Sequence, residues 1–196
     1  MNIENLQVRK DVIDGHPVYI VDNCLDGAHI DAYYKESMKV SFRKGETDFK
    51  GDQFPVFSYD FDPISFSSKY SIGKTADMLL AKLFPESDCT LFRSYINMIH
   101  YGDMEYPHRD CEIGKGNITF LYYVNNNWDY TWGGETKFYE DGEPRMAILP
   151  KPGRCVIFLG EVEHSAGVPT RICSSSRLTL ALKYAVDKKN DPCLIL

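Results

Sequence analysis

The segment Tyr106-Pro107-His108-Arg109-Asp110 carries two side chains of metal-binding type. In an extended strand, residues i and i+2 point to the same face, so His108 and Asp110 can hold one ion while Arg109 points away. His164, later in the chain, can supply a third ligand from another strand. Two imidazoles and one carboxylate leave three coordination positions open, the arrangement used by non-haem Fe(II) oxygenases. A single His-x-Asp pattern also arises by chance, so the triad is a hypothesis.

Arg177 opens the segment RLTLALKY, which reads as a strand. Alternation along it separates two sets of side chains: Arg177, Thr179, Ala181 and Lys183 on one face, and Leu178, Leu180 and Leu182 on the other. The leucine face must pack on another layer, which leaves the arginine face free to line a cavity. A guanidinium there can bind a carboxylate through two parallel hydrogen bonds. The alternative is a solvent-exposed surface arginine.

The elements that must position these residues begin with a mixed N-terminal half. We expect a strand over residues 16–23, a helix capped by Asp26 and running to about residue 38, and a short helix over residues 75–84 that Pro85 ends. Residues 41–72 are rich in Gly, Asp, Ser and Phe and show no sustained period. We expect them to form a long loop or irregular strands, either a lid over the site or a surface loop.

From residue 91 onward, apolar segments follow one another, each bounded by Gly, Pro, Asn or Asp. In order, they are LFRSYINMI, NITFLYYV, ETKFY, RMAIL, RCVIFL and RLTLALKY. Glu140-Asp141-Gly142-Glu143 between two of them predicts a hairpin. We therefore predict one mainly β domain over residues 1–196, with a helical and irregular elaboration over residues 1–90 that braces a β core over residues 91–185.

Composition and charge limit the kinds of binding partner and the cellular location that we expect. The net charge of −6 and the pI near 5.4 argue against nucleic acid or an anionic membrane. No apolar run reaches the length of a membrane span, and the N-terminus is too polar for a secretion signal. The six cysteines form no CxxC pair, which favours reduced thiols in the cytoplasm. The final Cys193-Leu194-Ile195-Leu196 fits a prenylation pattern, with an apolar tail that packs on the core as the alternative.

Seven blocks over about residues 93–185 resemble the prolyl 4-hydroxylase-like branch of the Fe(II)/2-oxoglutarate-dependent dioxygenase superfamily. In order, they are Tyr101-Gly102, HRD, FLYYVNNNWD, WGGETKFY, LPKPGRCVIF, EVEHS and SRLTLALKY. Each block is modest, but seven in the same order are specific. The resemblance implies a double-stranded β-helix, or jelly-roll, core.

The resemblance also implies an enzyme that uses Fe(II), 2-oxoglutarate and O2 to hydroxylate an unactivated C–H bond, with release of succinate and CO2. His108, Asp110 and His164 would hold the iron, and Arg177 would hold the C5 carboxylate of 2-oxoglutarate. By position, further cosubstrate contacts would come from Tyr123, Tyr101 and Thr136. The spacing from His164 to Arg177 is longer than in the oxygen-sensing relatives, so Arg171 is a rival anchor or a substrate contact.

Several residues near the expected site have two possible roles each. Trp128 and Trp132 could stack on a substrate or pack within their loop, and Asn97 could reach the pocket or stay in the strand ladder. We expect His16, His29 and His100 to be structural or solvated.

The expected substrate is a prolyl or other peptidyl or amino-acid side chain, and the first alternative is a free small molecule. A second hypothesis, from another class of function, is a non-catalytic or hydrolytic metal-binding β-helix protein. Arg177 distinguishes the two hypotheses, because such a protein does not need a carboxylate anchor opposite the metal. Related halogenases lack the carboxylate ligand, so Asp110 favours hydroxylation.

Overall fold

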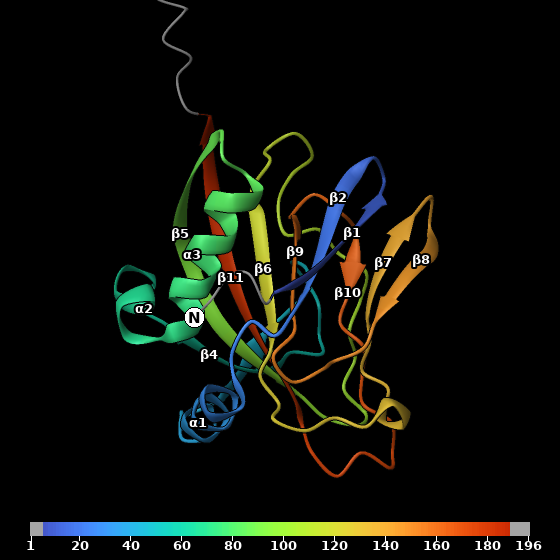
Figure 1. The fold of residues 1–196 in the computed structure, drawn as a ribbon. Helices are drawn as coiled ribbons and strands as arrows, with labels where there is room; N and C mark the ends of the chain where they lie inside the picture. The colour runs from blue at the N-terminus through green and yellow to red at the C-terminus, as the bar shows by residue number, and fades with distance from the viewer. Residues whose placement is uncertain (1–5, 189–196) are drawn as a thin grey trace, which may run out of the picture.

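Two antiparallel sheets and three helices make up residues 6–188, the part of the chain that the computed structural model describes (Figure 1). The larger sheet has the order β1 (Gln7–Ile13), β2 (His16–Asp22), β9 (Cys155–Leu159), β6 (Ile118–Tyr123), β11 (Arg177–Lys188), β5 (Ser87–Ile99), β4 (Val56–Phe61) and β3 (Arg43–Glu46). The smaller sheet has the order β10 (His164–Ser165), β7 (Thr136–Glu140) and β8 (Glu143–Ile148). The architecture confirms the predicted fold class.

The helices α1 (Gly27–Ser37), α2 (Pro63–Lys69) and α3 (Ser71–Leu83) cover one face of the larger sheet (Figure 1). Leu178, Leu180 and Leu182 of β11 belong to the buried cluster on this face. Fully burying a leucine side chain contributes about 1.5–3 kcal/mol, so this face alone fixes the orientation of β11. A second buried cluster joins the other face of the sheet to Phe138 and Ile148 of the smaller sheet.

Local signals in the sequence explain two elements. Asp26 caps α1, because its side chain accepts a hydrogen bond of 3.0 Å from the backbone N–H of His29. Asp141 and Gly142 both have positive φ, 53° and 75°, as a tight hairpin between β7 and β8 requires. Both predictions are confirmed, as are the helix near residues 75–84 and all six strands after residue 91.

The prediction for the N-terminal half was wrong in part. Residues 41–72 contain β3 and β4, which fit the predicted alternative of irregular strands, and the helix α2, which was not predicted. Residues before 91 also add strands to both edges of the larger sheet. The sequence hides these strands because β1 is exposed except at Ile13 and β3 has no buried residue. Pairing with a neighbour, rather than apolar alternation, holds such edge strands.

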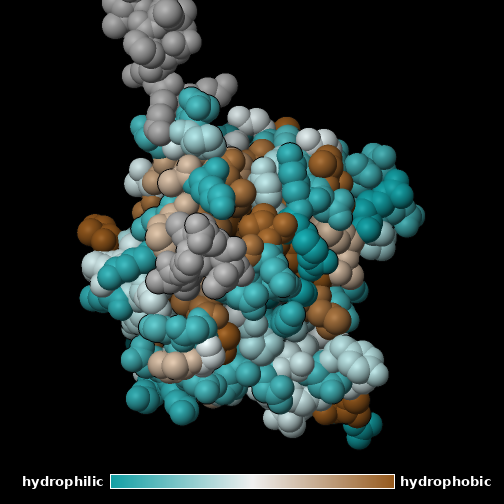
Figure 2. Space-filling model, viewed as in Figure 1, coloured by the Kyte–Doolittle hydropathy of each residue, from teal (hydrophilic) through white to brown (hydrophobic). Residues whose placement is uncertain are grey.

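No helix among residues 6–188 is long and apolar enough to cross a membrane. The face shown in Figure 2 is mainly hydrophilic, with hydrophobic side chains in separate small patches. Cys193 and the rest of the prenylation pattern lie outside the described residues.

Candidate active site

An antiparallel bridge brings the two histidines together. The N–H of His108 donates to the carbonyl of His164 at 2.9 Å, and the N–H of His164 donates back at 3.0 Å. Two residues on, the N–H of Asp110 donates to the carbonyl of Gly160 at 2.7 Å. The strand predicted around His108 and Asp110 is absent: His108 lies in an isolated bridge and Asp110 in a bend, although both side chains still reach one point. These backbone bonds place all three side chains at one point beside β10.

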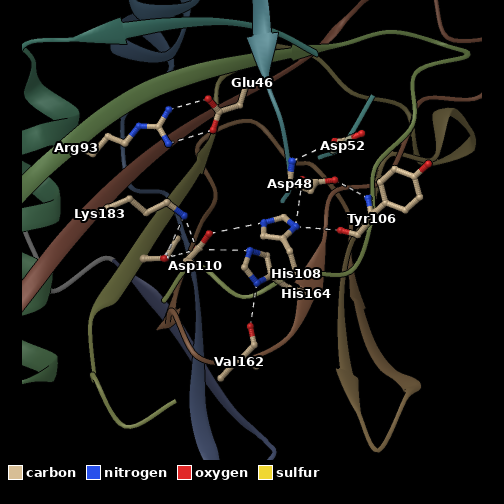
Figure 3. Close-up of polar contacts among 11 residues, drawn as sticks. Glu46, Asp48, Asp52, Arg93, Tyr106, His108, Asp110, Val162, His164 and Lys183 are labelled. Carbon is tan, nitrogen blue, oxygen red and sulfur yellow. Dashed lines mark hydrogen bonds and ion pairs between the residues drawn. The ribbon is translucent and has the colours of Figure 1, made fainter. Parts of the chain in front are cut away.

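The three ligand atoms lie within 4.8 Å of one another (Figure 3). The Nε2 atom of His108 is 3.7 Å from Asp110 Oδ1, and the Nε2 atom of His164 is 3.6 Å from Asp110 Oδ2. Each Nδ1 lies against a backbone carbonyl: that of His108 is 3.0 Å from Tyr106 O, and that of His164 is 2.9 Å from Val162 O. A carbonyl accepts only, so both Nδ1 atoms carry the proton and both Nε2 lone pairs face the space between the ligands.

The protonation states of His164 and Asp110 also suit metal binding. Burial lowers the pKa of His164 to about 4, so its ring is neutral near pH 7. Burial alone would raise the pKa of Asp110, but Lys183 and the two histidines hold it well below its ordinary value. Burial would lower the pKa of His108, but Asp110 and Asp48 raise it above its ordinary value, so a metal ion must displace a proton there. Neutral imidazoles and an ionised carboxylate are the forms that bind a cation. The donor set therefore fits Fe(II).

Asp48 is a further residue at this end of the cavity. Its carboxylate accepts a hydrogen bond of 2.5 Å from the N–H of Tyr106, and its Oδ1 lies 3.1 Å from His108 Nδ1 (Figure 3). A carboxylate behind a metal-binding imidazole fixes its ring and increases its basicity. Sequence reasoning missed Asp48, because it lies among other Asp and Gly residues without a period.

Lys183 contacts Asp110 directly. Its Nζ donates to Asp110 Oδ2 and lies 3.3 Å from Thr119 Oγ1, and the Thr119 hydroxyl donates to the same Oδ2 at 2.5 Å (Figure 3). Lys183 is only 8 % exposed, and the carboxylate raises its pKa against the effect of burial. Alternation placed Lys183 on the cavity face, but nothing in the sequence indicated its partner.

Arg177 lies at the other end of the cavity-facing side of β11 and is 1 % exposed. Its guanidinium donates to Gly134 O at 2.7 Å, to Thr179 Oγ1 at 2.5 Å and to Thr136 Oγ1 at 2.9 Å. Among residues 6–188 it forms no ion pair with a carboxylate. A buried guanidinium without an anion is costly, so this position fits the carboxylate of a bound ligand.

Tyr123 and Thr136 support that arginine. The ring of Tyr123 lies 5.5 Å from the guanidinium carbon of Arg177, and its hydroxyl contacts Thr136 Oγ1 at 2.8 Å and Ile148 O at 3.1 Å. Thr136 lines the cavity. Gly134, the second of two glycines before β7, allows close packing around the arginine. A Cβ atom at this position would lie 3.2 Å from Arg177 Cδ and 3.0 Å from the Trp128 ring.

A cavity of about 240 Å³ joins the two ends. Arg177, Thr179, Ala181 and Lys183 all line it, as alternation predicted, and Asn97 lines it from β5. Glu105, which sequence reasoning did not single out, lines it beside His108.

Five predicted contacts do not line this cavity, and one of them is Tyr123, whose hydroxyl is bonded to Thr136 and Ile148. Tyr101 lies in the turn after β5 with 64 % of its surface exposed, because the loop between this turn and His108 is short. Arg171 is exposed in the loop before β11. The rings of Trp128 and Trp132 pack edge to face at 5.4 Å, and Trp128 donates to Gly133 O at 3.0 Å. The tryptophans therefore take the loop-packing alternative, and Arg177 rather than Arg171 is the arginine in the cavity.

Comparisons with known proteins agree with this geometry. Residues 96–184 match the family model of the 2OG-Fe(II) oxygenase superfamily. No curated protein matches the sequence significantly.

Among solved structures, a Pseudomonas putida prolyl-4-hydroxylase is similar, with 17 % identity over 87 % of this chain and 92 % of that chain and a TM-score of 0.63. A viral collagen prolyl hydroxylase of Paramecium Bursaria Chlorella virus-1 has 17 % identity over 91 % and 95 % of the two chains and a TM-score of 0.61. The α-ketoglutarate-dependent epimerase SnoN from nogalamycin biosynthesis has 15 % identity over 85 % and 76 % and a TM-score of 0.62. At these identities the likeness concerns the fold.

The matched family, the shared fold and the donor set agree on one class, and they argue against the non-catalytic or hydrolytic alternative. Fe(II) and 2-oxoglutarate are the cofactors that this class implies. Residues 96–184, which carry the three metal ligands and Arg177, match the 2OG-Fe(II) oxygenase superfamily.

Proposed function

We propose that this enzyme hydroxylates an unactivated C–H bond of a prolyl or other peptidyl or amino-acid side chain. The overall reaction consumes the substrate, 2-oxoglutarate and O2 and forms the hydroxylated product, succinate and CO2. The observation that carries the proposal is one cavity with a three-ligand site at one end and an arginine without a carboxylate partner at the other. A metal-binding protein without an oxo-acid cosubstrate has no use for the second feature.

The chain's own residues divide the work. His108, Asp110 and His164 would hold Fe(II), and Asp48, Lys183 and Thr119 would keep two of these ligands in position. When bound, iron and 2-oxoglutarate supply the oxidising power, as cofactors do in general. Arg177 would hold the far carboxylate of 2-oxoglutarate, with Thr136 and Tyr123 fixing the guanidinium. Because Asp110 fills the third protein position, the site is typical of hydroxylases.

The substrate must share limited space with the cosubstrate. Pockets for drug-sized ligands enclose about 300–1,000 Å³, whereas this cavity encloses about 240 Å³. Only the reacting part of a substrate can therefore enter beside 2-oxoglutarate. That size suits a single side chain, and it suits a free small molecule, the alternative substrate, equally well.

Turnover in the absence of an identified substrate tests the proposal. Enzyme with Fe(II), 2-oxoglutarate and O2 should release succinate slowly, and His108→Ala should abolish the release. His29→Ala is the matched control, because His29 is exposed on α1 far from the triad in sequence. Full succinate release by His108→Ala would contradict the ligand assignment, and no release by the native enzyme would contradict the proposed function.

A further inference from the structure

Two oxygen atoms in the cavity wall have no hydrogen-bond partner. They are Oδ1 of Asn97 on β5 and Oε1 of Glu105 in the segment before His108, and both are buried. Both residues line the cavity that holds the metal ligands. A buried polar atom without a partner costs about 1–3 kcal/mol, so such atoms in an enzyme cavity indicate a missing ligand group.

The chemistry of these atoms restricts what can satisfy them. An amide oxygen accepts hydrogen bonds, and so does a carboxylate in its ionised form, so a group that satisfies both must donate. 2-Oxoglutarate cannot be that group, because its two carboxylates and its keto oxygen offer acceptors only. The donor must belong to the substrate.

Charge on the same wall favours a cationic donor. Glu105 and Asp52 form no ion pair with any Lys or Arg among the described residues, and Asp48 pairs only with His108. Burial and the neighbouring Asp48 raise the pKa of Glu105 to about 8 against the opposing charges of Arg177 and His108, and a further cation beside Glu105 would favour its ionised form. Two other cations of the cavity are engaged, since Lys183 contacts Asp110 and Arg93 makes two hydrogen bonds to Glu46 (Figure 3). The proposed function assigns Arg177 to 2-oxoglutarate.

We propose that the substrate of this enzyme presents a protonated nitrogen, an ammonium or guanidinium group, to the side-chain oxygens of Glu105 and Asn97. This inference rests on the proposed function and narrows it. The ring nitrogen of a prolyl residue within a peptide carries no proton and cannot satisfy either oxygen. A free amino acid or a basic side chain carries the donor that these oxygens lack.

Binding of small probes beside the metal tests this without an identified substrate. Mn(II)-loaded enzyme saturated with 2-oxoglutarate is mixed with 1-butylammonium, 1-butanol or butanoate, and the paramagnetic relaxation of the probe protons is measured. We expect the ammonium probe to bind best and butanoate worst. Glu105→Gln should weaken ammonium binding by about tenfold or more, the loss expected for a hydrogen bond to a charged group.

Two further variants sharpen the result. Asn97→Asp adds a second carboxylate to the same wall and should strengthen ammonium binding relative to butanol. Glu112→Gln is the matched control, because Glu112 is exposed and pairs only with Lys115, and it should change nothing. Equal binding of ammonium and butanol, or an ammonium preference that survives Glu105→Gln, would overturn the inference in favour of water at the two oxygens.

The same samples separate this inference from the proposed function. The visible absorption band of the Fe(II)–2-oxoglutarate chelate and the slow release of succinate are recorded for every variant. A variant that keeps the band is folded and loaded, so its probe result counts. Absence of the band and of succinate in the native enzyme would defeat the proposed function, whereas a normal band without ammonium preference would defeat only the present inference.

Discussion

Arg177 and Lys183 occupy the same face of β11, both almost completely buried, yet their surroundings differ. Lys183 contacts the carboxylate of Asp110, whereas Arg177 has only neutral partners, a carbonyl and two threonine hydroxyls. The first cation has a carboxylate in contact, and the second has none, because Glu105 and Glu135 act on it without forming an ion pair. A buried charge with its own partner maintains the site, and a buried charge without one receives a ligand.

The largest expected effect comes from breaking the paired cation. Lys183→Met leaves Asp110 buried without its cation, which should lower the free energy of unfolding of the metal-free enzyme by about 3–5 kcal/mol. Lys137→Met, at an exposed position of β7, is the matched control and should lie within about 0.5 kcal/mol of the native enzyme. Urea unfolding measures both, and equal midpoints for the two variants would refute the structural role of Lys183.

The unpaired cation should respond to ligand rather than to folding. Arg177→Met should leave the stability of the ligand-free enzyme within about 1 kcal/mol of native, because it removes a costly charge along with its hydrogen bonds. In the native metal-loaded enzyme, 2-oxoglutarate at a hundredfold excess over its Kd should add about 3 kcal/mol. The same concentration should add nothing measurable to Arg177→Met. Equal protection of the two proteins in thermal unfolding would show that Arg177 is not the anchor.

Metal should compensate for the loss of Lys183 but not of Arg177. A divalent ion can replace the ammonium as the charge beside Asp110, so Mn(II) should raise the Tm of Lys183→Met more than that of the native enzyme. Arg177→Met should gain as much from Mn(II) as the native enzyme does. If Lys183→Met gains no more than the native enzyme, the lysine and the metal do not share Asp110.

The smallest effect concerns an ion pair outside the cavity. Arg154 binds Asp22 through two hydrogen bonds of 2.7 and 3.0 Å, and the pKa of Asp22 is lowered chiefly by this contact. The unfolded state therefore binds this proton at higher pH than the native state, so the stabilisation is present above about pH 4 and is lost as the pH falls through the native pKa. Asp22→Asn should flatten the loss of stability in acid, and Mn(II) should not alter that difference. An unchanged acid unfolding curve would show that the pair contributes little.

The sequence revealed what depends on local geometry and periodicity. Spacing of two residues identified His108 and Asp110, and alternation along β11 placed Arg177 in the cavity and the leucines in the core. The hairpin at Asp141 and the cap at Asp26 have fixed chemical signatures, so they were predictable as well.

Contacts between distant segments were not predictable. Asp48, Glu105 and the pairing of Lys183 with Asp110 depend on how separate loops and strands meet, and no period records that. Tyr101 was assigned by position in the resemblance alone, and no local pattern predicts that its side chain is exposed. The edge strands β1 and β3 escaped notice because exposed strands need no apolar alternation.

The central claim is that iron and 2-oxoglutarate bind together between the triad and Arg177, and an anaerobic titration tests it directly. Fe(II) and 2-oxoglutarate should give the weak visible band of the chelate in the native enzyme. Arg177→Ala should need about a hundredfold or more 2-oxoglutarate for the same band, since truncating one side of a buried charge pair costs about 2–5 kcal/mol, whereas Arg171→Ala should titrate like the native enzyme. Absence of the band, or one that forms at the same concentration in Arg177→Ala, would contradict the account.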